Sequence, residues 1–196
     1  MQELTILLLL ILGYFIYINI IKKSIYLESV SSTVNHKSFL VRKLEDKQEA
    51  ADILDQLSQK LVDICNYSKN MQDISEERKD SIQRLISNFK PDKIIETMPG
   101  SSQVNYAINK ITEISICISD KKTNKLIDFN TIMFVAIHEL AHILTDETGH
   151  TPKFWDNMSF LLECGKQLNI YNPVDYQKHP INYCGKMITS TPLKNL

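Results

Sequence analysis

The hydrophobic pattern divides the chain into one continuous apolar stretch and a mixed remainder. Residues Leu4–Ile21 are apolar at all but three positions. As a helix this stretch would be about 27 Å long, close to the hydrocarbon thickness of a thin bilayer. A cleaved signal peptide is the alternative, but it needs a basic start and small residues at a cleavage site. Glu3 precedes the stretch instead, so we predict a retained transmembrane anchor over residues 1–23.

Two basic residues indicate how this anchor is oriented. Lys22 and Lys23 directly follow the apolar stretch, whereas no Lys or Arg precedes it. Basic flanks are retained on the cytoplasmic side of a membrane. We therefore expect a single-pass membrane protein whose catalytic domain lies in the cytoplasm.

The next segments predict a linker and two helices. Residues 24–39 show little periodicity, which is typical of a juxtamembrane linker. Apolar residues recur at helical spacing from Leu40 to about Tyr67, and again from Ser75 to Phe89 before Pro91. Residues 40–196 are thus expected to form one domain after the linker.

The pattern then changes from helical spacing to alternation. Val104–Ile108 and Ile114–Ile118 alternate apolar with polar residues, which indicates two short strands. In the second strand we expect Ser115 and Cys117 to be exposed. That strand would then be a sheet edge at which a peptide substrate docks by strand addition, although an interior strand remains the alternative. The fold class expected is α+β, with a short sheet beside the helices.

Charge and cysteine usage narrow the class of protein. The chain has 22 Lys and Arg residues against 23 Asp and Glu. It therefore lacks the basic excess that is typical of nucleic-acid-binding proteins. Four cysteines, at positions 65, 117, 164 and 184, are widely spaced and form no CxxC pair. Free thiols in a reducing compartment are the simpler interpretation, and disulfides remain the alternative.

The strongest chemical signal is the HExxH motif, His138-Glu139-Leu140-Ala141-His142. Residues four apart share a helix face, so both imidazoles can reach one metal ion. Glu139 lies beside that ion, where it can act as general base. Asp128 or Asn130 can cap the helix, whose apolar residues predict burial. A buried helix whose histidines only form hydrogen bonds is the alternative.

A catalytic zinc site needs a third protein ligand and an open fourth position. His150 follows Gly149, which permits a chain reversal, and precedes Thr151, a good helix cap. The reversal could direct His150 toward the same ion. Two acidic residues compete for this role, namely Asp146 and Glu163.

Asp146 continues the face of the two motif histidines, at the HExxHxxxD spacing seen in thermolysin-like enzymes. There the aspartate orients a ligand histidine rather than binding zinc. Glu163 lies about 180° from Phe154 around the next helix, so it is expected to face solvent.

Other polar and aromatic residues carry simpler expectations. Tyr183 could stabilise an oxyanion, although packing is the commoner role for such a tyrosine. Trp155 is expected in the core and Cys164 in helix packing, while His36 and His179 are expected at the surface.

HELAH followed by GHTPKFW resembles the WLM and SprT-like group of minimal zinc metallopeptidases, over about residues 104–170. The resemblance implies a zincin-like domain, a strand pair beside the active-site helix, zinc, and proteolysis of protein substrates. It implies His138, His142 and His150 as ligands and Glu139 as general base. Better-studied members act on DNA–protein crosslinks, but this chain has an anchor and no visible DNA-binding module. An anchor joined to such a domain and a Tyr183-Cys184-Gly185 tail also resembles uncharacterised proteins of large DNA viruses.

We therefore expect a membrane-anchored zinc metallopeptidase that hydrolyses peptide bonds through a zinc-activated water, with Glu139 as general base. The alternative is a membrane-anchored structural or interaction protein that keeps a non-catalytic zinc site. A latent peptidase whose N-terminal helices cover the cleft is a further alternative. Expected partners are protein or peptide substrates and the membrane.

Overall fold

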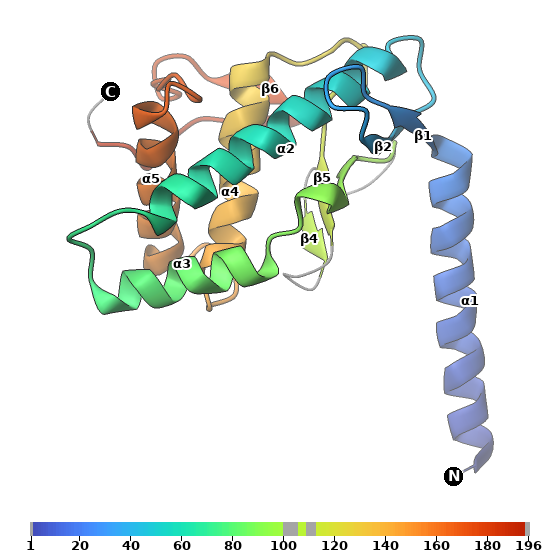
Figure 1. The fold of residues 1–196 in the computed structure, drawn as a ribbon. Coiled ribbons are helices and arrows are strands. Elements are labelled where there is room, and N and C mark those ends of the chain that lie inside the picture. Colours follow the sequence, from blue (N-terminus) through green and yellow to red (C-terminus); the bar gives the residue numbers. More distant parts are fainter. Residues whose placement is uncertain (1, 100–105, 109–112, 195–196) are drawn as a thin grey trace.

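The residues that the structure describes fold into helices and three small sheets, which agrees with the predicted α+β class (Figure 1). A computed structural model describes residues 2–99, 106–108 and 113–194. The elements in these ranges are α1 (Gln2–Tyr26), β1 (Leu27–Ser31), β2 (Ser38–Arg42), α2 (Lys47–Lys69), α3 (Glu76–Asn88), η1 (Pro91–Lys93), β3 (Ile94–Glu96), β4 (Tyr106–Ile108), β5 (Glu113–Ile116), α4 (Phe129–Leu144), α5 (Pro152–Gln167), β6 (Ile181–Tyr183) and β7 (Lys186–Ile188).

Helix α1 projects away from the other elements (Figure 1). Its segment Leu4–Tyr26 is long and apolar enough to cross a membrane, and none of its most apolar window is buried in the protein. The helix runs three residues beyond the predicted anchor and passes directly into β1. Near its end, the Lys23 ammonium lies 2.5 Å from a carboxylate oxygen of Glu113 on β5.

Strands β1 and β2 form an antiparallel hairpin where a linker and the start of a helix were expected. Phe39 and Val41 of β2 are buried in the core, and α2 begins only at Lys47. The hairpin turn is held by α2, because the backbone N–H groups of Thr33 and Asn35 donate to carboxylates on that helix. Such support from a distant element leaves no periodic signal in the strands themselves.

The core lies between the helices and the sheet. Helix α2 contributes a continuous buried stripe from Leu54 to Ile64, and α3 contributes Ile82 and Leu85. Both helices pack against α4, which also contacts β4 and β5. Truncating one such leucine to alanine typically costs about 2–5 kcal/mol. The structure thus contains both predicted helices, as α2 and α3, and Ser75 caps the start of α3.

The expectation that Ile114–Ile118 is a sheet edge is wrong. Strand β5 lies in the middle of the order β3-β5-β4, parallel to β3 and antiparallel to β4. Ser115 and Cys117 are buried, as are the alternating residues Ile114, Ile116 and Ile118. The unpredicted strand β3 pairs with the side of β5 that was expected to be free. Of the predicted strand Val104–Ile108, the part 106–108 forms β4 and Val104 lies outside the described residues.

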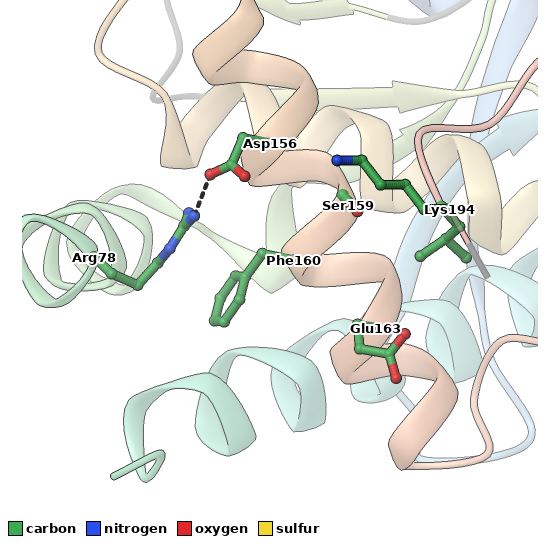
Figure 2. Close-up of a pocket in the computed structure, with 7 residues that line it drawn as sticks. Arg78, Asp156, Ser159, Phe160, Glu163 and Lys194 are labelled. Carbon is green, nitrogen blue, oxygen red and sulfur yellow. Dashed lines mark hydrogen bonds and ion pairs between the residues drawn. The ribbon is translucent and has the colours of Figure 1, made fainter. Parts of the chain in front are cut away.

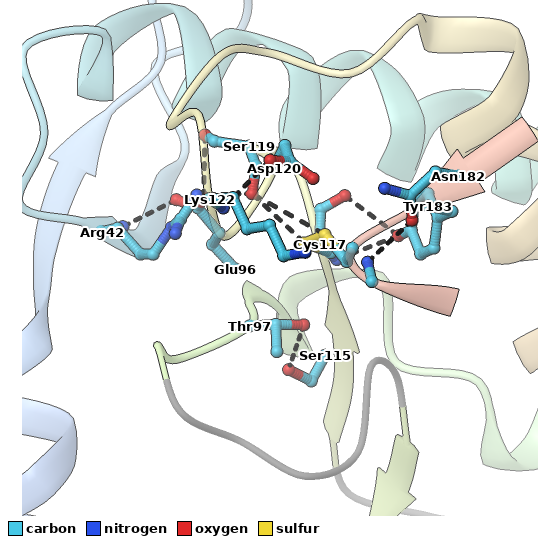
Figure 3. The surroundings of a disulfide bond; sticks show 12 residues. Arg42, Glu96, Thr97, Ser115, Cys117, Ser119, Asp120, Lys122, Asn182 and Tyr183 are labelled. Carbon is cyan, nitrogen blue, oxygen red and sulfur yellow. Dashed lines mark hydrogen bonds and ion pairs between the residues drawn. A yellow bond between two sulfur atoms is a disulfide. The ribbon is translucent and has the colours of Figure 1, made fainter. Parts of the chain in front are cut away.

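The free-thiol interpretation is wrong for two of the four cysteines. Cys117, just after β5, forms a disulfide with Cys184 in the C-terminal tail (Figure 3). Cys65 and Cys164 are buried free thiols. Cys184 and Gly185 both have positive φ and make the tight turn between β6 and β7. The tail is thus fastened to the end of the central strand.

A buried ion pair joins the N-terminal hairpin to the sheet. Arg42 Nε lies 2.8 Å from Glu96 Oε1, and the two side chains are 4% and 1% exposed. The Arg42 backbone N–H and the Ser119 hydroxyl also donate to the Glu96 carboxylate (Figure 3). The pair therefore links β2, β3 and the segment after β5 in one polar network.

Candidate metal centre

Helix α4 carries the HExxH motif in its last two turns. Asp128 caps its start by accepting a hydrogen bond from the Thr131 backbone N–H, at 2.9 Å. Thr145 follows its last residue and donates its hydroxyl hydrogen to the Ala141 carbonyl. Nearly all residues between are buried, as the apolar sequence predicts. The motif therefore stands on a rigid element with both ends capped.

The two motif histidines lie side by side on this helix. Their Nε2 atoms are 3.2 Å apart, and their rings meet edge to face at 80°. His138 and His142 are each half-buried. This arrangement follows from their four-residue spacing, which puts successive turns of the helix in register.

His150 reaches the same point from the loop between α4 and α5. Gly149 has φ +88°, a left-handed conformation that glycine adopts readily. Thr151 then caps α5 by accepting from the Phe154 backbone N–H, and Pro152 is the first helical residue. The reversal brings His150 Nε2 to 3.1 Å from His138 Nε2.

The three histidines could hold one metal ion. Their ligand atoms all lie within 4.8 Å of one another. Two nitrogens that are each about 2.0–2.1 Å from one zinc ion, at a tetrahedral angle, lie about 3.3–3.4 Å apart. The His138 Nε2 atom lies 3.2 Å from that of His142 and 3.1 Å from that of His150, and both distances are close to that value. Three histidine ligands would leave the fourth position of a tetrahedral ion open.

Two aromatic residues of α5 hold the histidine rings. Phe154 is fully buried, and its ring centre lies 4.9, 4.3 and 4.7 Å from those of His138, His142 and His150. Trp155 stacks on His150 at 5.4 Å. Trp155 is 40% exposed, so the expectation that it lies in the core is wrong. Successive side chains on a helix point about 100° apart. Because Phe154 points inward, Trp155 points toward the surface.

Burial controls the protonation of the motif residues. It lowers the pKa of His138 to about 3, with a smaller contribution from the neighbouring His142 and His150. That imidazole is therefore neutral and able to bind a metal at neutral pH. Burial also raises the pKa of Glu139 to about 8. A nearby cation would oppose this second effect by favouring the carboxylate.

The acidic competitors for the third ligand position do not belong to the group of three histidines. Glu163 is half-exposed on α5 and accepts a hydrogen bond from Gln167, as its helical position predicts. Asp146 is exposed, 3.2 Å from the Lys153 ammonium, and the hydrogen bond from Lys153 lowers its pKa. Lys153 also pairs with Glu77 on α3. Asp146 thus fastens the loop that carries His150.

Tyr183 has a structural position in the fold. Its side chain is buried, and its hydroxyl accepts from the Cys117 backbone N–H and donates to the Cys117 carbonyl, both at 3.0 Å (Figure 3). Both bonds hold β6 against the end of β5. This position favours the packing role over the suggested oxyanion role.

Comparison with known proteins places the chain among viral proteins. It is 33% identical over 165 residues to uncharacterised protein R325 of Acanthamoeba polyphaga mimivirus, which covers 84% of each chain. It is 39% identical over 82 residues to uncharacterised protein 136R of Invertebrate iridescent virus 6, covering 41% of this chain and 44% of that protein. Uncharacterised protein 042R of Invertebrate iridescent virus 3 is 36% identical over 94 residues, covering 47% of this chain and 53% of that one.

These relatives confirm the expected resemblance to uncharacterised proteins of large DNA viruses. No protein-family model matches the chain, so the WLM and SprT-like resemblance stays a prediction from the two motifs. No solved structure matches it either. With a third of its residues identical over most of both chains, the protein belongs to the same family as protein R325 of the mimivirus.

Proposed function

We propose that this protein is a zinc-dependent metallopeptidase that cleaves peptide bonds in protein substrates. The observation that supports it best is that the Nε2 atoms of His142 and His150 both lie close to that of His138, on the helix that carries the HExxH glutamate. Three nitrogen ligands and an open fourth position are the donor set of a catalytic rather than a structural zinc site. A purely structural site would gain nothing from Glu139.

The roles of the residues follow from their positions. His138, His142 and His150 would hold the ion, which would supply Lewis acidity toward a carbonyl oxygen and lower the pKa of water. Glu139 takes a proton from the attacking water and delivers it to the leaving amine. Phe154 excludes water beneath the three imidazoles and keeps their rings oriented.

The proposal extends to the location of the enzyme. Helix α1 would anchor it in a membrane, and the lysines after the span favour a cytoplasmic catalytic domain. Its substrates would then be proteins that approach that membrane surface. The balanced charge of the chain argues against nucleic acid as a partner.

The proposal is tested on the full chain in detergent micelles. Zinc content and cleavage of unfolded casein are measured for the wild type, Glu139→Gln and His150→Ala, with His179→Ala as a matched control at an exposed histidine. We expect Glu139→Gln to keep its zinc and lose about 10²–10⁴-fold in cleavage rate. His150→Ala should lose both, and His179→Ala neither. Stoichiometric zinc without any wild-type cleavage would favour the structural alternative.

A further inference from the structure

An exposed tryptophan beside a metal centre calls for a physical explanation. Outside α1, the large apolar side chains that are exposed among the described residues are Val34, Trp155 and Met187. Tryptophan is usually well buried, because its indole offers the largest apolar surface of any side chain. One face of Trp155 stacks on His150, so the indole reaches from the metal centre to the surface.

The indole also forms one wall of a cavity of about 420 Å³. Pro152 of α5 and Pro192 of the C-terminal tail provide further rigid apolar walls. Polar groups complete the lining, namely Asp156, Ser159, Ser190, Thr191 and Lys194. Ligand sites of this kind combine flat apolar walls with a few polar groups.

This cavity continues along the outer face of α5. A second cavity of about 390 Å³ shares Asp156, Ser159 and Lys194 with the first and extends to Glu163. Figure 2 shows Arg78 approaching α5 from one side of it and Lys194 from the other. From Trp155 to Glu163 the helix rises about 12 Å, the length of about three to four residues of extended chain.

We propose that this groove binds an extended segment of the substrate, and that the cavity beside Trp155 receives an aromatic side chain. The inference rests on the proposed peptidase function and adds a substrate class to it. An aromatic ring can stack on the free part of the indole and lie between the two prolines. Asp156 is paired with Arg78, and across the two cavities Arg78 and Lys194 balance Asp156 and Glu163, so the groove has no strong preference for a charged residue. Trp155 thereby becomes a specificity residue directly next to His150.

Binding can be followed by tryptophan fluorescence, because Trp155 is the single tryptophan of the chain. Turnover is prevented by the substitution Glu139→Gln. The zinc-loaded full chain carrying Glu139→Gln is titrated in micelles with the end-blocked peptide Ala-Ala-Phe-Ala-Ala. The tryptophan fluorescence of the protein is recorded in this titration and in a second titration with Ala-Ala-Ala-Ala-Ala. We expect a saturable change with the phenylalanine peptide and about tenfold weaker binding of the alanine peptide, as loss of an apolar group from a pocket typically produces.

Two added variants locate the site. Ser190 is exposed and lines the cavity, so Ser190→Phe places a ring in the cavity without altering the histidines. This variant should bind the phenylalanine peptide about tenfold more weakly. Met187→Phe, at an exposed position outside the cavity, should leave binding unchanged. Equal affinity for the two peptides, or equal binding by Ser190→Phe, would overturn the proposed aromatic site.

Cleavage separates the two proposals. If the wild type cleaves casein but shows no aromatic preference, the peptidase function stands and the subsite is wrong. If Trp155 reports selective binding but no peptide is cleaved, the groove binds peptides and the peptidase function is wrong. Selective binding together with preferential cleavage of the phenylalanine peptide supports both.

Discussion

At the scale of single residues, the candidate metal centre depends on how each imidazole is held. His138 and His142 are positioned by the helix that carries them, whereas His150 depends on a loop. That loop is secured by Gly149, by the cap of Thr151 and by the contact between Asp146 and Lys153. Substitutions at these positions should therefore differ in their effect on zinc affinity.

We expect His150→Ala to abolish tight zinc binding, because it removes one of the three proposed ligands. Asp146→Ala should cost about 10–100-fold, the usual loss when a residue that supports a ligand is removed. Glu163→Ala is the matched acidic control and should bind zinc like the wild type, since Glu163 faces Gln167 on the outer side of α5. Competition with a chromophoric chelator measures all three affinities. Normal affinity of the His150 variant would refute the ligand assignment.

The thiols provide a second prediction at this scale. Burial raises the pKa of both Cys65 and Cys164 to about 12, so neither is appreciably ionised at pH 8. Iodoacetamide should therefore leave the native protein unlabelled. After denaturation it should label two cysteines without reductant and all four with reductant, as intact mass will show. Four labelled cysteines without reductant would mean that Cys117 and Cys184 are not bonded.

At the scale of elements, the hairpin, the sheet and the tail converge on the end of β5. The Arg42–Glu96 pair connects β2 to β3, and the disulfide and Tyr183 connect the tail to the residue after β5. Since α4 packs against β5, these connections also support the helix that carries the HExxH motif. Breaking a buried ion pair by removing one partner is strongly destabilising, because the other charge is left buried.

Arg42→Met should accordingly lower the free energy of unfolding by about 3–5 kcal/mol. The double variant Arg42→Met/Glu96→Gln should recover much of that loss, because it no longer buries an unpaired carboxylate. Lys47→Met serves as control: it removes a half-exposed ion pair with Glu28 and should cost about 1 kcal/mol or less. Denaturant titration in micelles measures each value. Similar losses for Arg42→Met and Lys47→Met would contradict the structural importance of the buried pair.

At the scale of the whole molecule, two features favour opposite sides of the membrane. Lys22 and Lys23 after the apolar span predict a cytoplasmic domain. The Cys117–Cys184 disulfide is typical of oxidising compartments, including the surfaces of virions and cells. The lysines act during insertion, whereas a disulfide can form later if the protein reaches an oxidising environment. The cytoplasmic orientation therefore stays our prediction for newly inserted protein.

Protease protection in sealed microsomes tests that orientation. We expect the domain after α1 to be digested without detergent, because basic residues at the end of the span resist translocation. Lys22→Glu/Lys23→Glu removes this bias and should increase the protected fraction. If the wild-type domain is shielded until detergent is added, the orientation inferred from the lysines is wrong and the disulfide would indicate the correct side.

Local sequence patterns were sufficient for the features that depend on neighbours along the chain. The pairing of His138 with His142 follows from helical spacing, and the caps at Asp128 and Thr151 follow from short-range hydrogen bonds. The apolar character of α1 is likewise a property of composition alone. Each of these requires only a few consecutive residues to adopt one conformation.

Features that depend on partners far along the chain were decided by the tertiary structure. Strand β5 is central because β3 pairs with it from 20 residues earlier, at Ile94 and Ile114. Cys117 finds Cys184 across a separation of 67 residues. Trp155 is exposed because Phe154 takes the inward position against the three histidines. The apolar pattern specifies which residues avoid water, but which of them meet is determined only when the elements pack together.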